Sequence, residues 1–238
     1  MTDLLELRGV SAGYGGSDVL RDLSIAVPAG GVTCIVGPNG AGKSTILRVV
    51  SGQLKPRRGS VLFDGVDIAG RSTRQILGLG IVQVAQNHTL FPEMTVRENV
   101  ELGGFLIRSR AEVARRLDRV TELFPIVRDR GTDRAGSLSG GQQRLVEFAR
   151  CLMLEPRLVV LDEPSMGLDP KTLRLVLRQV RTMRESGRTV LLVEQNVRAG
   201  LSLATHAVVV ESGHVQLEGT GADLRNSSEV ARLYLGVH

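Results

Sequence analysis

Aromatic side chains are scarce in this sequence, which has no tryptophan, two tyrosines and five phenylalanines among 238 residues. Proteins that bind single-stranded nucleic acid use such side chains as stacking platforms. The formal net charge is +5, but the arginines are scattered along the chain instead of forming one cluster. Ordinary solvated surfaces explain this charge, so no nucleic-acid partner is expected.

Long hydrophobic runs are also missing, because the most apolar segments, such as residues 158–161 and 190–193, end at charged residues. None approaches the roughly 18 residues of a membrane-spanning helix. The first residues lack the basic region and long apolar core of a secretory signal, which predicts a cytoplasmic protein. Cys34 and Cys151 lie in apolar runs and are expected to be small buried residues, not a disulfide or metal site.

The first quarter of the chain alternates short β-like runs with glycine-rich turns, which predicts a β-rich beginning. An apolar helical pattern follows Thr45 and ends near Gly52, and residues 60–63 are typical of another strand. Strands and helices alternate again in the last third, where the apolar run 158–161 precedes a helix expected between Asp169 and Gly187. This order is typical of a parallel sheet, and therefore of an α/β fold.

The middle of the chain, about residues 88–152, has a helical character. Capping boxes, in which Ser or Thr stands three positions before Glu or Gln, predict three helix starts in this segment. The pairs are Thr95 with Glu98, Ser109 with Glu112, and Ser139 with Gln142. One face of the second helix carries apolar residues at core spacing, which indicates packing against a neighbouring element.

A phosphate-binding loop, or P-loop, is matched in full between a strand-like and a helix-like run. It consists of Gly37, Pro38, Asn39, Gly40, Ala41, Gly42, Lys43, Ser44 and Thr45. Its glycines let backbone amides turn toward phosphate oxygens, Lys43 reaches the β- and γ-phosphates, and Ser44 ligates Mg²⁺. A functionless glycine-rich turn is the alternative, but the flanking strand and helix favour the P-loop. ATP and Mg²⁺ are therefore the predicted cofactors.

A P-loop requires a carboxylate for its metal ion, and Asp162 and Glu163 stand at the end of an apolar strand-like run. Ligands of open α/β sheets gather outside the carboxyl ends of the strands. Asp162 is therefore expected beside Ser44, holding Mg²⁺, and Glu163 is expected to polarise the attacking water. By themselves, two adjacent acids could equally belong to a solvated turn.

A second motif resembles the signature motif of the ABC ATPases. It comprises Ser139, Gly140, Gly141 and Gln142, after Leu138. Alone it could be a plain capped helix start, but it follows the P-loop and precedes the acid pair, as in that family. The resemblance covers residues 5–235. It implies a single ABC ATPase domain, 1–238, with a P-loop NTPase fold.

Within that domain the resemblance implies a RecA-like nucleotide-binding core with an antiparallel β subdomain, residues 1–87 and 153–238, and a helical signature-motif insert, residues 88–152. It also implies a head-to-tail dimer. In such a dimer the signature motif of one chain closes over ATP held by the P-loop of the other. Hydrolysis is then completed only when two cassettes associate.

Three further positions are similar to functional residues of the family. Tyr14 is similar to the aromatic residue that stacks on adenine, although packing near a turn explains it as well. Gln86 is similar to the glutamine that senses the magnesium ion and the attacking water. Asp169 lies in the loop that contacts the opposite subunit, and it also suits a helix N-cap before Pro170.

One position departs from the family pattern, because Gln195 stands where a histidine usually senses the γ-phosphate. A glutamine amide donates one neutral hydrogen bond and carries no proton, so a charge-assisted contribution is lost. The hydrolysis rate is therefore expected not to depend on titration of residue 195.

The sequence around Gln195, together with residues 10–14, 102–105 and 233–236, is similar to the LivF type, the second ATPase of branched-chain amino acid importers. Residues 167–170 depart from that type, and importers of urea or other amides share its features. The resemblance implies transmembrane permeases, a second ABC ATPase or another copy of this chain, and a periplasmic or extracellular substrate-binding protein. It places the chain on the cytoplasmic face of the membrane.

The segment 87–95 is expected to contact a cytoplasmic permease helix, with Phe91 and Met94 as candidate contacts or, alternatively, core residues of the insert. Non-transport ABC ATPases that act on DNA or ribosomes are a rival class. Their long coiled coil or tandem cassettes are not found in the sequence. A nucleotide switch without turnover is a third possibility, and the presence of Glu163 argues against it.

Overall fold

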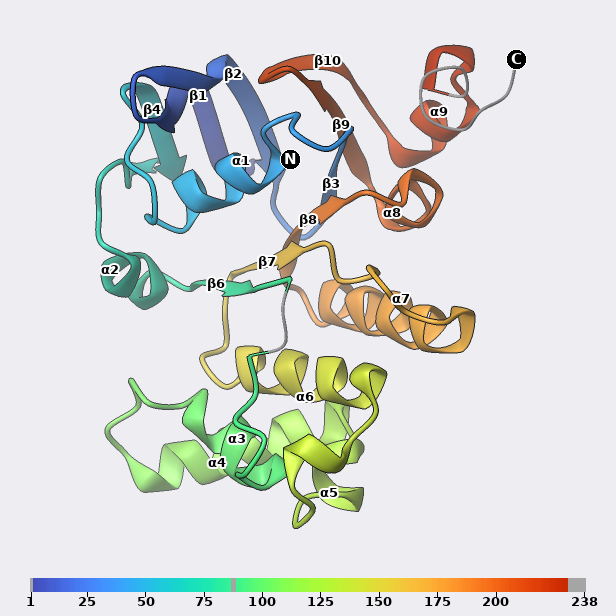
Figure 1. The fold of residues 1–238 in the computed structure, drawn as a ribbon. Coiled ribbons are helices and arrows are strands. Elements are labelled where there is room, and N and C mark those ends of the chain that lie inside the picture. The colour runs from blue at the N-terminus through green and yellow to red at the C-terminus, as the bar shows by residue number, and fades with distance from the viewer. Residues whose placement is uncertain (1, 87–88, 231–238) are drawn as a thin grey trace.

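The computed structural model describes residues 2–86 and 89–230, which form two sheets with helices between and below them (Figure 1). The smaller sheet is antiparallel, with the order β2-β1-β4-β5. Its strands are β1 (Asp3–Tyr14), β2 (Ser17–Pro28), β4 (Arg58–Phe63) and β5 (Val66–Asp67). The side chains of Leu5, Val10 and Leu20, which belong to this sheet, are fully buried. One face of the sheet therefore covers the core.

The larger sheet has six strands in the order β10-β9-β3-β8-β7-β6. Its strands are β3 (Val32–Val36), β6 (Ile81–Val84), β7 (Leu158–Asp162), β8 (Thr189–Glu194), β9 (His206–Glu211) and β10 (His214–Gly219). The five strands from β9 to β6 run parallel to one another, and β10 is antiparallel to β9. The central strands β3, β8 and β7 are mostly apolar and are buried apart from the partly buried Asp162 at the end of β7, because elements cover both faces. The predicted α/β class is confirmed.

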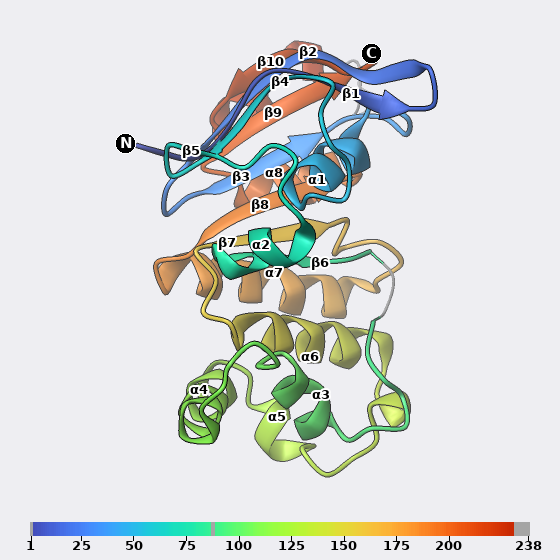
Figure 2. The same cartoon turned by 90° about the vertical axis from the view of Figure 1, so that its left-hand side faces the viewer.

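One helix, α1 (Lys43–Val50), lies between the two sheets (Figures 1 and 2). Its side chains Ile46 and Leu47 belong to one cluster with Leu5 of the small sheet and Leu191 of the large sheet. This packing fixes the helix whose first residue is Lys43. The P-loop therefore enters a rigid element held from both sides.

The other face of the large sheet carries α6 (Gly140–Leu152), α7 (Pro170–Glu185) and α8 (Val197–Leu203). Below α6 lie α3 (Val96–Leu102), α4 (Arg110–Leu123) and α5 (Ile126–Asp129), as both views show. The remaining helices are α2 (Thr73–Gly78) and α9 (Gly221–Asn226). We propose residues 88–152 as a helical insert because α3 to α6 pack with one another beneath the sheet.

All three expected helix starts are present in the insert, with Thr95, Ser109 and Ser139 as the N-caps. Thr95 and Ser139 form complete capping boxes. Ser109 accepts a hydrogen bond from the Glu112 amide, but the Glu112 carboxylate does not return to the Ser109 backbone. The expected reciprocal box at α4 is therefore wrong.

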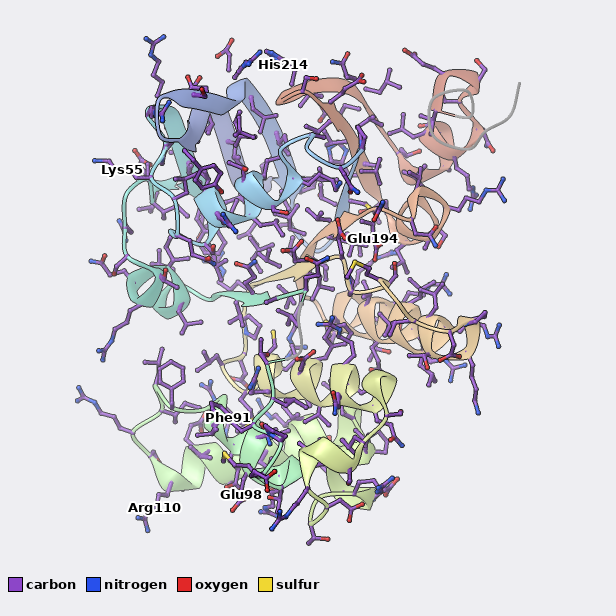
Figure 3. All side chains as sticks on the ribbon, in the orientation of Figure 1. Lys55, Phe91, Glu98, Arg110, Glu194 and His214 are labelled. Atoms are coloured by element: carbon purple, nitrogen blue, oxygen red, sulfur yellow. The ribbon has the colours of Figure 1, made fainter. Side chains whose placement is uncertain are left out.

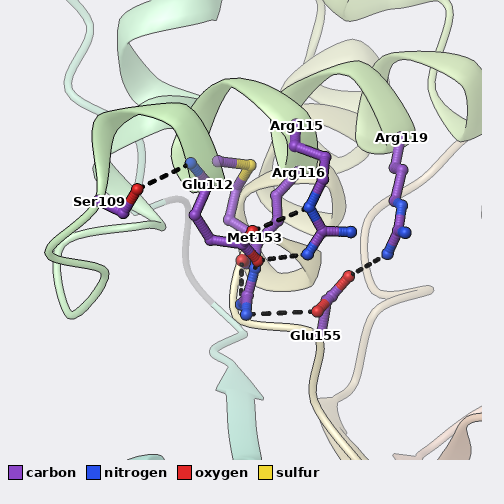
Figure 4. Close-up of polar contacts among 7 residues, drawn as sticks. All are labelled: Ser109, Glu112, Arg115, Arg116, Arg119, Met153 and Glu155. Atoms are coloured by element: carbon purple, nitrogen blue, oxygen red, sulfur yellow. Dashed lines mark hydrogen bonds and ion pairs between the residues drawn. The ribbon is translucent and has the colours of Figure 1, made fainter.

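The Glu112 carboxylate pairs with Arg115 and Arg116 on its own helix instead (Figure 4). These hydrogen bonds lower its pKa to about 2. Arg116 also donates to the Met153 carbonyl and pairs with Glu155, so the network joins α4 to the end of α6. Two arginines within one helical turn thus hold the Glu112 carboxylate away from the Ser109 backbone, while the Ser109 side chain still caps the helix.

Other differences from the expected elements are local. The insert contains α5, a helix of four residues after Pro125, in addition to the three expected helices. The strands β1 and β2 are longer than the short runs in the sequence suggested, because β-bulges interrupt their hydrophobic alternation. Cys34 and Cys151 are free and buried, as expected.

No helix in residues 2–86 and 89–230 is long and apolar enough to span a membrane. Two features used in the sequence analysis fall outside the described part of the chain. These are Asn87, where the expected permease contact begins, and the LivF-like ending at residues 233–236.

Candidate nucleotide-binding site

Four loops meet at one edge of the large sheet, because β3, β8, β7 and β6 are parallel neighbours in that order. Their carboxyl ends lead into the P-loop, Gln195, the pair Asp162–Glu163, and Gln86, respectively. These residues are far apart in the sequence. The topology alone therefore brings together the predicted phosphate, metal and catalytic residues.

The P-loop backbone requires glycine at several positions. Gly40 and Gly42 have φ angles of 81° and 105°, which side chains disfavour. A Cβ atom on Gly37 would lie 2.1 Å from the Val210 carbonyl oxygen, and one on Gly42 would lie 2.8 Å from Leu20. The loop is therefore pressed against β9 and β2, with its amides at the start of α1, where a helix favours an anion.

Lys43 is 5% exposed and its ammonium lies inside the loop. Its Nζ donates to the carbonyls of Gly37 at 2.8 Å and Pro38 at 3.0 Å, and lies 3.9 Å from Glu163 Oε1. Burial lowers its pKa, and the charges of Glu163, Asp162 and Glu194 oppose this effect. The ammonium is thus held where phosphate oxygens would replace backbone carbonyls as its partners.

A cavity of about 510 Å³ extends beside α1 and is lined by Ser44, Gln86 and Asp162. Burial raises the pKa of Asp162, and the charge of Glu163 raises it further, so a nearby cation would stabilise this carboxylate. Among the described residues no group of three His, Cys, Asp or Glu could hold a metal. A hydroxyl, an amide and one carboxylate nevertheless suit Mg²⁺, which takes few protein ligands beside substrate phosphates.

Glu163 and Gln86 are directly linked. Gln86 Nε2 donates to Glu163 Oε2 at 3.2 Å and also approaches the Met166 sulfur at 3.0 Å. The Glu163 backbone has a φ of 44°, a conformation that non-glycine residues rarely adopt. A strained, nearly buried carboxylate beside Lys43 is the arrangement expected of a group that orients water.

A second cavity, of about 290 Å³, opens on the other side of Glu163. It is lined by Glu163, Ser165, Met166, Gly167, Glu194, Gln195 and Asn196. Gln195 is exposed in this cavity, whereas Glu194 is buried. Gln195 therefore lines a cavity together with Glu163, and its role at the γ-phosphate stays a prediction.

Known proteins share this combination of fold and loops. The family described as "ABC transporter" matches residues 20–166, which include the P-loop, the signature motif and the acid pair. This chain belongs to the ABC transporter family of ATPases.

Relatives match the cassette along its whole length. The high-affinity branched-chain amino acid transport ATP-binding protein BraG of Pseudomonas aeruginosa is 37% identical over 98% of this chain and 100% of its own. The lipopolysaccharide export system ATP-binding protein LptB of Escherichia coli is 34% identical over 98% and 97%. A crystal structure of the ADP conformation of MJ1267, an ATP-binding cassette of an ABC transporter, has a TM-score of 0.90 at 29% identity, covering 100% of both chains.

Tyr14, the predicted adenine contact of the cassette, lies at the end of β1 and is half exposed. Arg48 on α1 donates to the Tyr14 hydroxyl at 2.7 Å, with its guanidinium 5.5 Å from the ring centroid. The ring is thus held over the P-loop helix by an arginine that sequence reasoning missed. Stacking on adenine stays a prediction for Tyr14.

The signature motif occupies the start of α6. Ser139 and Gly140 are exposed, so the amides at this helix start are accessible. Gly141 has a packing role, since a Cβ atom there would lie 2.2 Å from Thr172 Cγ2 at the start of α7. Asp169 caps α7 by accepting hydrogen bonds from the amides of Lys171 and Thr172. The expected helix N-cap is therefore confirmed, and the contact of Asp169 with an opposite subunit stays a prediction.

Further along α6, three charged side chains hold the segment that carries Gln86. Arg144 donates to the carbonyls of Ala85 at 2.8 Å and Gln86 at 2.6 Å, and pairs with Glu147. Glu147 accepts from the Thr89 amide, and Arg150 donates to the Thr89 carbonyl. This is the α6 clamp, formed by Arg144, Glu147 and Arg150. In the sequence, the signal for this clamp is the spacing of three residues between these charged side chains, which places them on one face of a helix.

The effect of Gln195 is testable by Gln195→His. Histidine has a pKa of about 6.5, so its charged form would donate a stronger hydrogen bond to phosphate below that pH. We expect the ratio of variant to wild-type kcat to rise as the pH falls from about 8 to about 6. ATPase assays across this range measure the ratio, which cancels other ionisations. A ratio that stays constant with pH would show that residue 195 does not contact the reacting phosphate.

Proposed function

We propose that this ABC ATPase binds ATP with Mg²⁺ and energises an importer of branched-chain or other hydrophobic amino acids from the cytoplasmic face of the membrane. The catalytic part is supported by one geometric observation, the contact of Gln86 with Glu163 beside Lys43. The substrate class is supported by the full-length similarity to BraG. The LivF-like residues around Gln195 agree with it.

The proposed mechanism follows from where each side chain lies. P-loop amides and Lys43 hold the phosphates, and Ser44 and Asp162 would hold Mg²⁺, which when bound neutralises charge on the β- and γ-phosphates. Glu163 orients and polarises a water for attack on the γ-phosphorus. Gln86 donates to Glu163 and keeps that carboxylate directed into the site. Gln195, which lines a cavity together with Glu163, would donate a hydrogen bond to the γ-phosphate.

A dimer is required because one cassette cannot complete the site by itself. In both cartoon views β6 and β7 lie between α1, which follows the P-loop, and α6, which begins with the signature motif (Figures 1 and 2). The helix α6 therefore lies on the other side of the sheet from α1, so its signature amides would be out of reach of phosphates held by the P-loop of the same chain. A second copy or a sister ATPase would supply them head to tail, with Tyr14 stacking on the adenine.

The permease contact is proposed at an apolar cavity of about 460 Å³ between the sheet and the insert. Phe91 and Phe105 line it and are 54% and 67% exposed. Thr89, Glu147 and Arg150 line the same cavity. Because Thr89 and Gln86 are held by the α6 clamp, a permease helix pressed into this groove would move the loop that carries Gln86. Met94 is partly buried and lies outside the lining.

Truncation of the exposed ring tests this contact. We expect Phe91→Ala to lower transport at least about fivefold while ATP hydrolysis by the detached cassette changes less than about twofold, because an exposed anchor contributes to binding and little to folding. Transport is measured in reconstituted vesicles, and ATP hydrolysis is measured on the purified cassette in solution. Val66→Ala is the matched control, since Val66 is equally exposed but lies on β5 of the small sheet. Unchanged coupling in Phe91→Ala would contradict the proposed contact.

The substrate class is tested by uptake in cells that lack this chain. We expect loss of labelled leucine, isoleucine and valine uptake, restored by the wild-type chain but not by Lys43→Ala. Retained amino-acid uptake together with lost urea or amide uptake would support the related importer instead. A defect in lipopolysaccharide export would favour the function for which LptB is named. Such an importer would also contain permeases and an external substrate-binding protein.

A further inference from the structure

A buried carboxylate outside the expected catalytic set joins two loops of the site. Glu194, the last residue of β8, is 1% exposed (Figure 3). Its Oε1 accepts from the Ser165 amide at 3.0 Å and its Oε2 accepts from the Ser165 hydroxyl at 2.6 Å. Ser165 belongs to the loop after β7, two residues beyond Glu163. One side chain therefore ties the loop after β7 to the end of β8.

The carboxylate is directed at Ser165 by tight packing behind it. A Cβ atom on Gly200 of α8 would lie 3.2 Å from Glu194 Cβ and 2.6 Å from the Cys34 sulfur. The stem of Glu194 is thus enclosed between α8 and β3. Burial raises the pKa of Glu194, and hydrogen bonds from Ser165 and the Asn196 backbone oppose this. A buried acid of this kind is costly unless its hydrogen bonds are made.

The backbone of Glu163 shows what the Glu194–Ser165 hydrogen bonds stabilise. Glu163 has a φ of 44°, a conformation that costs free energy in a non-glycine residue and persists only when its surroundings enforce it. The Glu163 amide donates to the Val193 carbonyl at 2.9 Å. Ser165 then anchors the far side of the same turn on Glu194. The turn is therefore fixed to the last two residues of β8, at one point before and one point after its bend.

We propose that Glu194 and Ser165 form a latch that holds Glu163 in its strained turn and sets the position of the adjoining Gln195. They are positioning residues, since both act through Glu163 and Gln195 and neither is assigned a contact with ATP. The inference rests on the proposed role of Glu163 in hydrolysis. It adds the Glu194–Ser165 pair to the residues that hydrolysis requires. This pair belongs to none of the P-loop, the acid pair and the signature motif.

A double-mutant cycle tests the latch in the purified membrane complex. We expect Ser165→Ala to lower kcat about fivefold and Glu194→Ala at least about tenfold, with the double variant no worse than Glu194→Ala, because both remove one interaction. The KM for ATP should change less than about twofold, since the P-loop is intact. Ser165→Thr retains the hydroxyl and should keep kcat within about twofold of wild type.

Several results would overturn the latch. Additive losses in the double variant would show that the two residues act separately. Equal losses of kcat in Ser165→Thr and Ser165→Ala would show that the Ser165 hydroxyl does not hold Glu163 in place. If Glu194→Ala does not fold, Ser165→Ala and Ser165→Thr still test the latch, because only the first removes the hydroxyl that donates to Glu194. A wild-type complex without turnover would overturn the role of Glu163 and the latch together, whereas an additive cycle in an active complex overturns the latch alone.

Discussion

Glu163→Gln is expected to lower kcat for ATP hydrolysis by about 10²–10⁴-fold, the usual contribution of a positioned general base. Glutamine has the same shape and still accepts a hydrogen bond from Gln86, so the loop should keep its conformation. It cannot accept a proton from water, and that loss falls on the chemical step. ATP binding should be retained or tightened, because one negative charge near the phosphates disappears.

Single-turnover hydrolysis and equilibrium binding of ATP, measured on the same preparation, separate these two effects. Glu185→Gln is the matched control, since Glu185 is an exposed acid at the end of α7. It should hydrolyse ATP at the wild-type rate. Hydrolysis by Glu163→Gln within about tenfold of wild type would be inconsistent with a catalytic base, and would assign that task to another group.

Lys43→Ala is expected to weaken ATP binding about 100-fold, because removing a charge-assisted hydrogen bond worth up to about 3 kcal/mol changes affinity by that factor. Lys43 Nζ is already directed at the Gly37 and Pro38 carbonyls within the loop. Phosphate oxygens entering the loop would take over these hydrogen bonds, and alanine offers none. Titration with a fluorescent ATP analogue measures the dissociation constant.

The control for this variant is Lys55→Ala. Lys55 is exposed at the outer edge of the molecule, away from the P-loop (Figure 3), and its loss removes the same formal charge. We expect its affinity for ATP to equal that of wild type. If both lysine variants weaken binding equally, long-range charge would explain the loss, and the proposed contact of Lys43 with phosphate would be wrong.

The predictions that succeeded relied on residues close together in the sequence or on strand ends. The apolar runs before Gly37 and Asp162 indicated strands, and parallel strands place their carboxyl ends at one edge. Asp162 and Ser44 were therefore expected together, and they line one cavity. The α/β fold and the family followed from the same local motifs.

The contacts that the sequence did not predict join residues far apart in the chain. Arg48 reaches Tyr14 across 34 positions, and Arg144 reaches Gln86 across 58. Charged residues such as Arg144 on an amphipathic helix are usually solvated, so the sequence does not predict that Arg144 is buried. Its burial results from the packing of α6 against the large sheet. The capping box at Glu112 is incomplete because of residues close in the sequence. Arg115 and Arg116 form stronger hydrogen bonds with that carboxylate than the Ser109 backbone amide would.

We propose that this ATPase works as a dimeric cassette on a membrane importer. The most direct test is to tag Glu163→Gln, which should hold ATP without cleaving it, and to identify the proteins that co-purify from native membranes with ATP and Mg²⁺ present. We expect two permeases, a second cassette and an external amino-acid-binding protein. Recovery of ribosomal or DNA-bound proteins, without any membrane partner, would contradict it.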